Sequence, residues 1–414
     1  MTQLTDWVRK SGVFLPPVLA WDGVPVSAFS VFDAAVDGAQ AVFLGEMDHF
    51  VHEKTDFRLL MLRYLQSRGV TRWAEELSGS DGVRVNRYLR GEDDQLHRLV
   101  GLGFEDDLRS DRIDRPTGIL KASFDAYPVS LFAAEQRRFY RGLRTVPPPD
   151  RFAGFDIDAL PGAAYANILD AIGDLAEKPA VAAWLRQLER RPGESVAEEA
   201  ARVRTCLHGL KDLIADLGSA ERVGAVGLSL ATHAQTLDYI AAAYGAADYP
   251  SLSPGLALRE TFMKDLALEA IQHGGRIVPT AFMAHALHLL KDDALGGGAG
   301  ASGPGGARVS SLGHYLAKEC AFPTVSIWML WAEGEDSQPF PDLPTRFAYP
   351  KDSLNAALAP IGRPVMFPVA GAPPGLFDRP WRVGHMYNQT VDVTLQGQVD
   401  AILFLPRVSP LRPD

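Results

Sequence analysis

The chain has 414 residues, of which 47% are hydrophobic, so it is long enough to bury one large core or two ordinary ones. Its formal net charge is −10 and no long basic stripe is present, which makes nucleic acid and anionic membrane surfaces poor partners. With only two cysteines, no apolar signal core in the first residues and no apolar run of about 18 residues, we expect a soluble cytoplasmic protein without a disulfide framework.

The first strand is predicted at 41–45, where a short apolar run ends in Gly45 and is followed by Glu46 and His49. Such a run is typical of a buried strand in a parallel sheet. Apolar residues then recur at helical spacing over 52–67, which predicts an amphipathic helix packed on that sheet. Because ligands of parallel sheets gather beyond the carboxyl ends of the strands, Glu46 and His49 lie where we expect chemistry.

A second strand is predicted at 70–74 and also ends in acid, at Glu75 and Glu76, before a helical segment at 83–89. Carboxylates and imidazoles should therefore meet at one edge of the sheet. Further strands are predicted at 151–155, 276–283, 323–331, 365–369, 381–386 and 399–405.

The segment from about 162 to 247 is rich in Ala, Leu, Glu and Arg with helical periodicity and few strand signals. We therefore predict an α/β fold with a mostly parallel central sheet flanked by helices. Residues 1–158 and 251–414 would form the two parts of the α/β core, and 159–250 a helical insertion that forms one wall of a cleft. A glycine-rich segment at 296–306 is either a lid or an unconstrained loop, and it lacks the Gly-Lys-Ser/Thr of a phosphate loop.

Several motifs carry a family resemblance. The order Gly45-Glu46-x-x-His49, with Glu53, Arg58, Glu76, Asn86, Tyr88 and Gly91 after it, resembles the opening of the erythromycin esterase family. The resemblance continues in colinear order through Arg259–Met263, Ala284–His288 and Leu312–Leu316. It is weak between about residues 95 and 250. It implies a hydrolase in which histidine and carboxylate activate water, without a required metal.

Four positions depart from the family pattern. Asp48 stands where members usually have Ser or Thr, Phe50 where many have Gly, Ala286 where Asn is usual, and Leu266 where Asn is common. These departures leave the proposed proton-transfer residues intact but change their neighbours. The resemblance therefore does not carry the substrate over.

His49 is the predicted general base, since an imidazole with a pKa near 6.5 is largely neutral at cytoplasmic pH and can take a proton from water. Its other nitrogen needs an acceptor, which Glu46 or Glu76 could supply, although either carboxylate could instead pair with Arg58. The other predicted roles are stabilisation of the tetrahedral intermediate by His285, His288 and Arg58, and substrate contact by Asp48 and Tyr387.

Two competing kinds of site are weaker. His285-x-x-His288 invites a zinc site, but the His-Glu-x-x-His pattern is absent and the cysteines are remote, so we expect no metal and no other cofactor. Ser229 lies in Gly-Leu-Ser-Leu-Ala, which approaches a nucleophile elbow. The elbow requires a strand before the serine, whereas this segment is predicted to be helical, so we expect Ser229 to be a packing or capping residue.

The expected function is hydrolysis of a small-molecule ester or lactone, in the manner of an esterase that inactivates a macrolide antibiotic, without a covalent intermediate. The rival hypothesis is a non-hydrolytic descendant that binds, cyclises or rearranges a polyketide-like product in a biosynthetic pathway. Acyl transfer or ring closure would use the same residues with water excluded. Asp48, Leu266 and Ala286 are the features that favour the rival.

Overall fold

The computed structural model describes residues 2–100, 103–105, 129–146, 149–158, 163–189, 191–217, 219–243, 253–292, 310–337, 345–385 and 389–413. The glycine-rich segment at 296–306 and Tyr387 lie outside the described residues.

A mostly parallel sheet forms the centre of the molecule, as predicted. Its strands follow the order β1-β10-β13-β8-β2-β7-β3-β4, and β9 pairs with β8. Neighbours from β13 to β4 are parallel, whereas β1, β9 and β10 pair antiparallel. The bounds are β1 Val13–Phe14, β2 Ala41–Glu46, β3 Arg72–Ser78, β4 Arg151–Asp156, β7 Thr280–His285, β8 Thr324–Glu335, β9 Arg346–Ala348, β10 Val365–Pro368 and β13 Ala401–Val408.

Two predicted strands differ from the structure. The segment predicted at 276–283 divides into a small hairpin, β5 (Gln272–His273) with β6 (Arg276–Ile277), and the central strand β7. The strand predicted at 381–386 forms β11 (Pro380–His385), which pairs with β12 (Gln389–Thr394) outside the central sheet. The remaining predicted strands lie within a few residues of their expected bounds.

Helices cover both faces of the sheet. They include α3 (Glu53–Ser67), α4 (Gly79–Leu89), α7 (Val129–Thr145) and α12 (Ser253–Ile271). Shorter helices are α1 (Thr2–Ser11), α2 (Asp33–Val36), α13 (Leu312–His314) and α14 (Leu354–Leu358). The 3₁₀-helices are η1 (Val26–Phe32), η2 (Gln95–Arg98), η3 (Gly173–Glu177), η5 (Ala286–Leu289) and η8 (Ala359–Ile361), and η7 (Tyr315–Glu319) is a π-helix.

Alternate residues of each central strand pack on opposite faces, because side chains of a strand point up and down in turn. In β2, Val42 shares a core cluster with Leu59 of α3, whereas Phe43 shares another with Met263 of α12. All six residues of β2 are buried, which is why its sequence reads as a continuous apolar run. This alternation decides on which face each polar residue at the strand end will lie.

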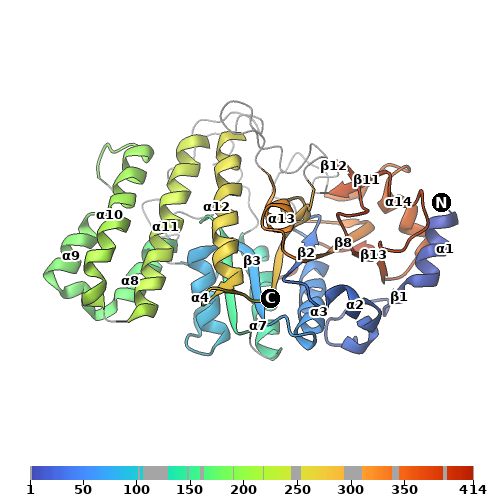
Figure 1. The fold of residues 1–414 in the computed structure, drawn as a ribbon, viewed down its shortest axis with the longest axis horizontal. Helices are drawn as coiled ribbons and strands as arrows, with labels where there is room; N and C mark the ends of the chain where they lie inside the picture. Colours follow the sequence, from blue (N-terminus) through green and yellow to red (C-terminus); the bar gives the residue numbers. More distant parts are fainter. Residues whose placement is uncertain are drawn as a thin grey trace.

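A group of helices stands at one end of the molecule, next to α4 and α12 and far from the N-terminal helix α1 (Figure 1). It consists of α8 (Ala163–Ile172), α9 (Pro179–Arg186), α10 (Val196–Leu217) and α11 (Ala220–Ala243), which share a hydrophobic cluster. Ser229 lies within α11, as predicted, and accepts a hydrogen bond from Asn167 Nδ2 at 2.5 Å. None of the described helices is long and apolar enough to cross a membrane.

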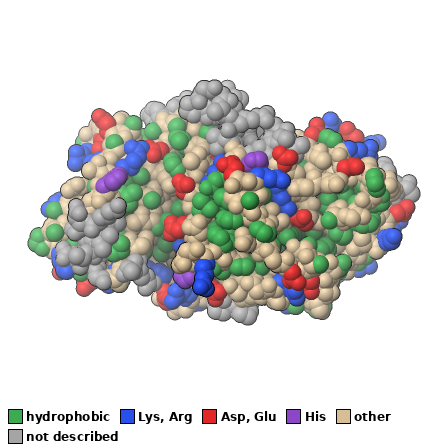
Figure 2. All heavy atoms as spheres, in the orientation of Figure 1, with side chains coloured by type: hydrophobic (Ala, Val, Ile, Leu, Met, Phe, Trp, Pro, Cys, Tyr) green, Lys and Arg blue, Asp and Glu red, His purple; other side chains and the backbone are tan. Residues whose placement is uncertain are grey.

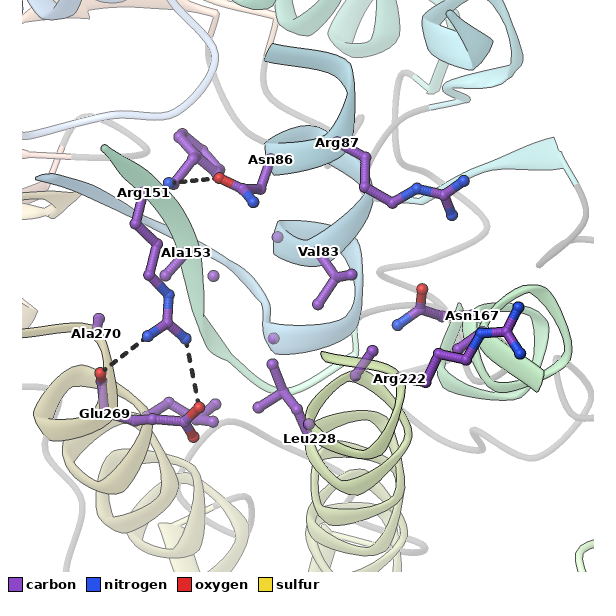
Figure 3. Close-up of a pocket in the computed structure, with 18 of the residues that line it drawn as sticks. Val83, Asn86, Arg87, Arg151, Ala153, Asn167, Arg222, Leu228, Glu269 and Ala270 are labelled. Carbon is purple, nitrogen blue, oxygen red and sulfur yellow. Dashed lines mark hydrogen bonds and ion pairs between the residues drawn. The ribbon is translucent and has the colours of Figure 1, made fainter. Parts of the chain in front are cut away.

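A pocket of about 420 Å³ lies between this helical group and the edge strand β4. Helices α8 and α11 form one wall, and α4, β4 and α12 form the other. Asn86 of α4 accepts a hydrogen bond from the backbone of β4, and Arg151 lies beside Glu269 of α12 (Figure 3). The residues predicted to act in catalysis do not line this pocket.

Acidic and basic side chains are interspersed on the face of the molecule drawn in Figure 2, and no continuous basic stripe is visible there.

Candidate active site

The carboxyl ends of the parallel strands bring the predicted residues together. Glu46 ends β2 and lies opposite His285, which ends β7. Glu76 lies near the end of β3, and Asp156 ends β4. His288 follows β7 within η5. The structure therefore gathers Glu46, His49, Glu76, His285 and His288 at one edge, as the strand-end rule predicts.

His49 is the histidine of this group with an open side, since 26% of its side chain is exposed. Its Nδ1 lies 3.1 Å from Oε1 of the buried Glu46. A carboxylate can only accept, so in the neutral ring Nδ1 carries the proton and the lone pair lies on Nε2. Nε2 lies 4.0 Å from Glu76 Oε2, too far for a hydrogen bond. Of the two predicted orienting carboxylates, Glu46 is the one in contact.

Arg58 of α3 lies beneath this pair. It donates to Glu46 from Nη2 (2.7 Å) and Nε (3.3 Å), and to Glu75 Oε1 from Nη1 (2.6 Å). Tyr140 of α7 donates to the other Glu75 oxygen at 2.9 Å. Only 4% of the Arg58 side chain is exposed, and its partners are carboxylates rather than open space. The geometry therefore favours support of Glu46 over the predicted contact with the reaction intermediate.

The charge of Glu46 is maintained by these neighbours. Burial alone would raise the pKa of Glu46, but the Arg58 guanidinium and the hydrogen bond from His49 outweigh burial and lower it to about 2. Burial likewise opposes the charge of Arg58, whereas Glu46 and Glu75 raise its pKa. At neutral pH, His49 therefore rests on a permanently ionised carboxylate.

Glu76 anchors the opposite face of the sheet. Its Oε1 accepts from Arg259 Nη2 at 2.7 Å, and its Oε2 accepts from the backbone nitrogen of His285 at 2.8 Å. Arg259 of α12 also forms two hydrogen bonds with Asp156, at 2.9 and 2.6 Å. Strands β3 and β7 stop pairing after Glu75 and Met283, so β3 offers no backbone partner to His285. The buried Glu76 carboxylate accepts the hydrogen bond of the His285 backbone nitrogen instead.

The two adjacent acids of β3 serve different faces. Glu75 points towards α3 and α7, and Glu76 towards α12, as alternation along a strand requires. Between Glu75 and Ser78, β3 has one more residue than β4, so a bulge follows Glu75. The strand pattern indicated that acids lie here, but gave no sign that each had its own partners.

His288 is held between two carboxylates. Its Nδ1 donates to Glu260 of α12, and its Nε2 lies 3.4 Å from Glu76 Oε1. Burial alone would lower the pKa of His288, but Glu260 and Glu76 outweigh burial and raise it to about 8. His288 is therefore largely a cation at neutral pH, and it can stabilise developing negative charge.

The ring of His285 contacts backbone groups of the turns on either side of it. Its Nδ1 accepts from the backbone nitrogen of Leu287 at 3.3 Å, and its Nε2 donates to the Met47 carbonyl at 3.2 Å. Burial, followed by the nearby His49, lowers the pKa of His285 to about 3, so it is neutral. Both ring nitrogens are engaged by backbone, so the ring braces the turn before His49 and offers no nitrogen to an intermediate.

Asp48 was predicted to contact the substrate, but its side chain is 0% exposed. Its Oδ1 accepts a hydrogen bond from the backbone of Phe50 at 2.7 Å. A loop residue has no periodicity from which its direction can be read, which is why the sequence did not reveal this burial. The structure therefore places Asp48 inside the protein, beside the turn that carries His49.

Sequence reasoning missed several side chains of the site. Asp156 follows the strand predicted at 151–155, so the strand-end rule could have found it. Arg259 and Glu260 belong to a motif that resembles the family, although no role was assigned to them. Tyr140 and His385, whose ring lies 6.2 Å from that of His285, had no signal in the sequence pattern.

Among the residues that the structure describes, no group of three or more His, Cys, Asp or Glu side chains is placed to hold a metal ion.

No protein-family model matches the sequence, and no curated protein matches it either. Solved structures match over nearly the whole chain. A protein from Bacillus cereus has a TM-score of 0.72 and 17% identity, covering 100% of this chain and 99% of its own. A succinoglycan biosynthesis protein has a TM-score of 0.69 and 15% identity, covering 100% of this chain and 98% of its own.

A third solved structure is a mutant of the erythromycin esterase EreC in its open conformation. It has a TM-score of 0.62 and 18% identity, and the match covers 96% of this chain and 98% of the esterase. With sequence identities this low, the structural matches establish the fold alone. The chain therefore has the fold of the erythromycin esterases, which its strand-end motifs had predicted.

Proposed function

We propose that the protein hydrolyses an ester, and that lactones are its main substrate class, by attack of a water molecule that His49 activates. The observation that carries this proposal is the arrangement of His49, with Nδ1 on the buried Glu46 carboxylate, Nε2 without a hydrogen bond among the described residues, and an exposed side. A partly open imidazole held in this tautomer can act as a general base.

In the proposed reaction the water oxygen bonds to the acyl carbon while a water proton passes to Nε2 of His49. Negative charge then develops on the former carbonyl oxygen, next to the cationic His288. When the acyl carbon–oxygen bond breaks, the leaving alkoxide takes the proton back from His49. The products are a carboxylic acid and an alcohol, which are joined in one molecule when the substrate is a lactone.

The other residues hold these groups in place. Arg58 fixes Glu46, and Glu76 ties Arg259, His288 and the end of β7 together. Arg259 has a second role in this proposal, which is to add positive charge beside the intermediate. Its Nη1 makes no hydrogen bond among the described residues, and 22% of its side chain is exposed. No metal, cofactor or covalent intermediate enters the scheme.

One structural neighbour is an erythromycin esterase, which supports an ester or lactone as substrate. Another is a succinoglycan biosynthesis protein, which keeps a second candidate open. In that candidate the same fold binds, cyclises or rearranges a product within a biosynthetic pathway, with water excluded from the site. The buried Asp48 beside the His49 turn, where the family usually has Ser or Thr, favours this second candidate.

A single-turnover experiment in ¹⁸O-labelled water distinguishes the two. The parent protein, His49→Gln and a control, His97→Gln, would be tested against macrolactones and simple esters with mass spectrometry. His97 is exposed in η2 and hydrogen-bonds locally. We expect the label in the product acid, and a loss of about 100- to 10,000-fold for His49→Gln only, as for removal of a general base. Full activity of His49→Gln would refute the mechanism, and tight product binding without turnover of any ester would favour the second candidate.

A further inference from the structure

Two buried carboxyl groups lie beside the turn that carries His49. Asp48 immediately precedes His49 and is 0% exposed, and Asp336 follows β8 and is 4% exposed. The Asp48 Oδ1 accepts from the backbone of Phe50, whereas its buried Oδ2 receives no N–H donor from the residues that the structure describes. The carboxyl of Asp336 lies close enough to that of Asp48 to act directly on its charge. The two acids are therefore electrostatic neighbours.

The backbone holds these acids together. The nitrogen of Ser337, next to Asp336, donates to the Phe50 carbonyl at 3.0 Å. Phe50 in turn donates to Asp48, so the turn after β2 and the end of β8 are joined on both sides of the acid pair. These contacts hold the backbone that carries Asp336 beside the turn that carries Asp48.

Two further titratable groups face the pair. Lys54, at the start of α3, donates to the His49 carbonyl at 2.8 Å and lies over the Phe132 ring at 4.9 Å. Tyr349, which follows β9, is 9% exposed and interacts with both aspartates. Lys54 forms no hydrogen bond with either acid among the described residues. Its charge therefore offsets only part of the repulsion that two ionised aspartates would feel.

Two carboxylates cannot both ionise at hydrogen-bonding distance in a buried site, and a hydrogen bond between them requires one proton. The surroundings agree with this requirement, because burial and the neighbouring Asp336 raise the pKa of Asp48 well above its usual value. A serine or threonine at this position, as in the family resemblance, would instead bring its own hydroxyl proton. Asp48 therefore replaces a hydroxyl, which can donate a hydrogen bond throughout the neutral pH range, with a carboxyl group that can donate only while it is protonated.

We propose that Asp48 and Asp336 share one proton, and that this hydrogen bond holds the His49 turn against the end of β8. Both aspartates are then positioning residues for the reaction. The bond completes a set of restraints on the turn, in which His285 holds the Met47 carbonyl and Lys54 holds the His49 carbonyl. The kinetic part of this inference rests on the proposed function, whereas the shared proton does not.

The shared proton is tested by NMR titration of protein labelled with ¹³C at the aspartate carboxyl carbons. In the parent, we expect one carboxyl to titrate well above the ordinary aspartate value of about 3.9. The signal should disappear in Asp48→Asn and in Asp336→Asn, and persist in the control Asp392→Asn, whose side chain is 70% exposed. If every aspartate of the parent titrates in the ordinary range, the inference is wrong, whether or not the protein hydrolyses esters.

The positioning role is tested by kinetics. Asp48→Ala should lower kcat by about 10- to 100-fold with little change in KM, as expected when a base is displaced by a fraction of an ångström or more. Asp48→Asn and Asp48→Ser, which keep a donor, should recover most of kcat. They should also remain active at a higher pH than the parent, where the acid pair ionises. An Asp48→Ala variant with the kcat of the parent, or identical pH profiles for parent and Asp48→Asn, would overturn the positioning role.

Discussion

Arg58 binds both oxygens of a single carboxylate, that of Glu46, through Nη2 at 2.7 Å and Nε at 3.3 Å. The two-point contact fixes the plane of the carboxylate as well as its position. Because Glu46 then accepts from His49, the orientation of the imidazole is set through a residue whose side chain is itself buried.

Removal of Arg58 should therefore affect stability as well as turnover. Arg58→Met leaves Glu46 and Glu75 buried without the cation that is hydrogen-bonded to both, and we expect a loss of about 3–5 kcal/mol in the free energy of unfolding. Denaturant unfolding would measure it, with Arg346→Met as control, because Arg346 forms an exposed pair with Glu335 at 2.7 Å. Equal stability of the two variants would show that the buried cation is dispensable.

The charge of His288 should make the rate of the proposed reaction depend on pH. Its pKa is raised to about 8, first by Glu260, so kcat/KM should fall as the pH rises through that value and the proton is lost. In Glu260→Gln the fall should move to lower pH, because the carboxylate that stabilises the cation is gone. Glu269→Gln, also on α12 but 54% exposed, serves as control. The pKa of Lys54 is also lowered to about 8, but Lys54 is present in both variants, so its titration affects both pH profiles in the same way. A fall that stays at the same pH in Glu260→Gln would contradict the assignment to His288.

His285 should remain neutral, with the proton on Nε2, throughout the neutral pH range, because burial lowers its pKa to about 3. Its ¹⁵N chemical shifts would report both the tautomer and the absence of titration. A titration near pH 6.5, the usual value for histidine, would return His285 to the role of acid or base.

The reaction should not require a metal ion. Extensive chelation should leave rate and melting temperature unchanged, whereas a catalytic zinc would lose its activated water. Activity that disappears on chelation and returns specifically with zinc would refute the histidine-only mechanism.

Ser229→Ala should behave as the parent in turnover. Ser229 is fully buried in α11 and bonded to Asn167, so the expected cost is about 1–2 kcal/mol of stability, from the lost hydrogen bond and the unpaired amide. Hydroxylamine trapping should yield no acylated peptide. An acyl group found on any side chain would establish a covalent route instead.

The sequence was sufficient to locate the edge at which the site lies. Glu46 and His285 are 239 positions apart, yet both end apolar runs, and the carboxyl ends of parallel strands share one edge. The family resemblance added that the motif at Glu46 and the motif at His285 belong to the same site. Strand ends are readable because burial on both faces leaves a continuous apolar run that stops abruptly.

The partners of each residue were not readable. Glu260 and Tyr140 reach the site from helices, and which side chain of a helix meets a strand end depends on packing angles that the apolar pattern does not encode. The same holds for the burial of Asp48 in a turn. Periodicity identifies the edge of a sheet, but it does not identify which nitrogen or oxygen is already engaged there.

The position of β2 between β7 and β8 has a consequence for how the protein is made. Both neighbours of this apolar strand come from residues 280–335, so a nascent chain shorter than that exposes two unpaired edges at Ala41–Glu46. Unpaired edges of apolar strands promote association with other chains. During synthesis the ribosome must therefore add most of the chain before β2 is protected, and truncated forms should aggregate rather than fold into a smaller protein.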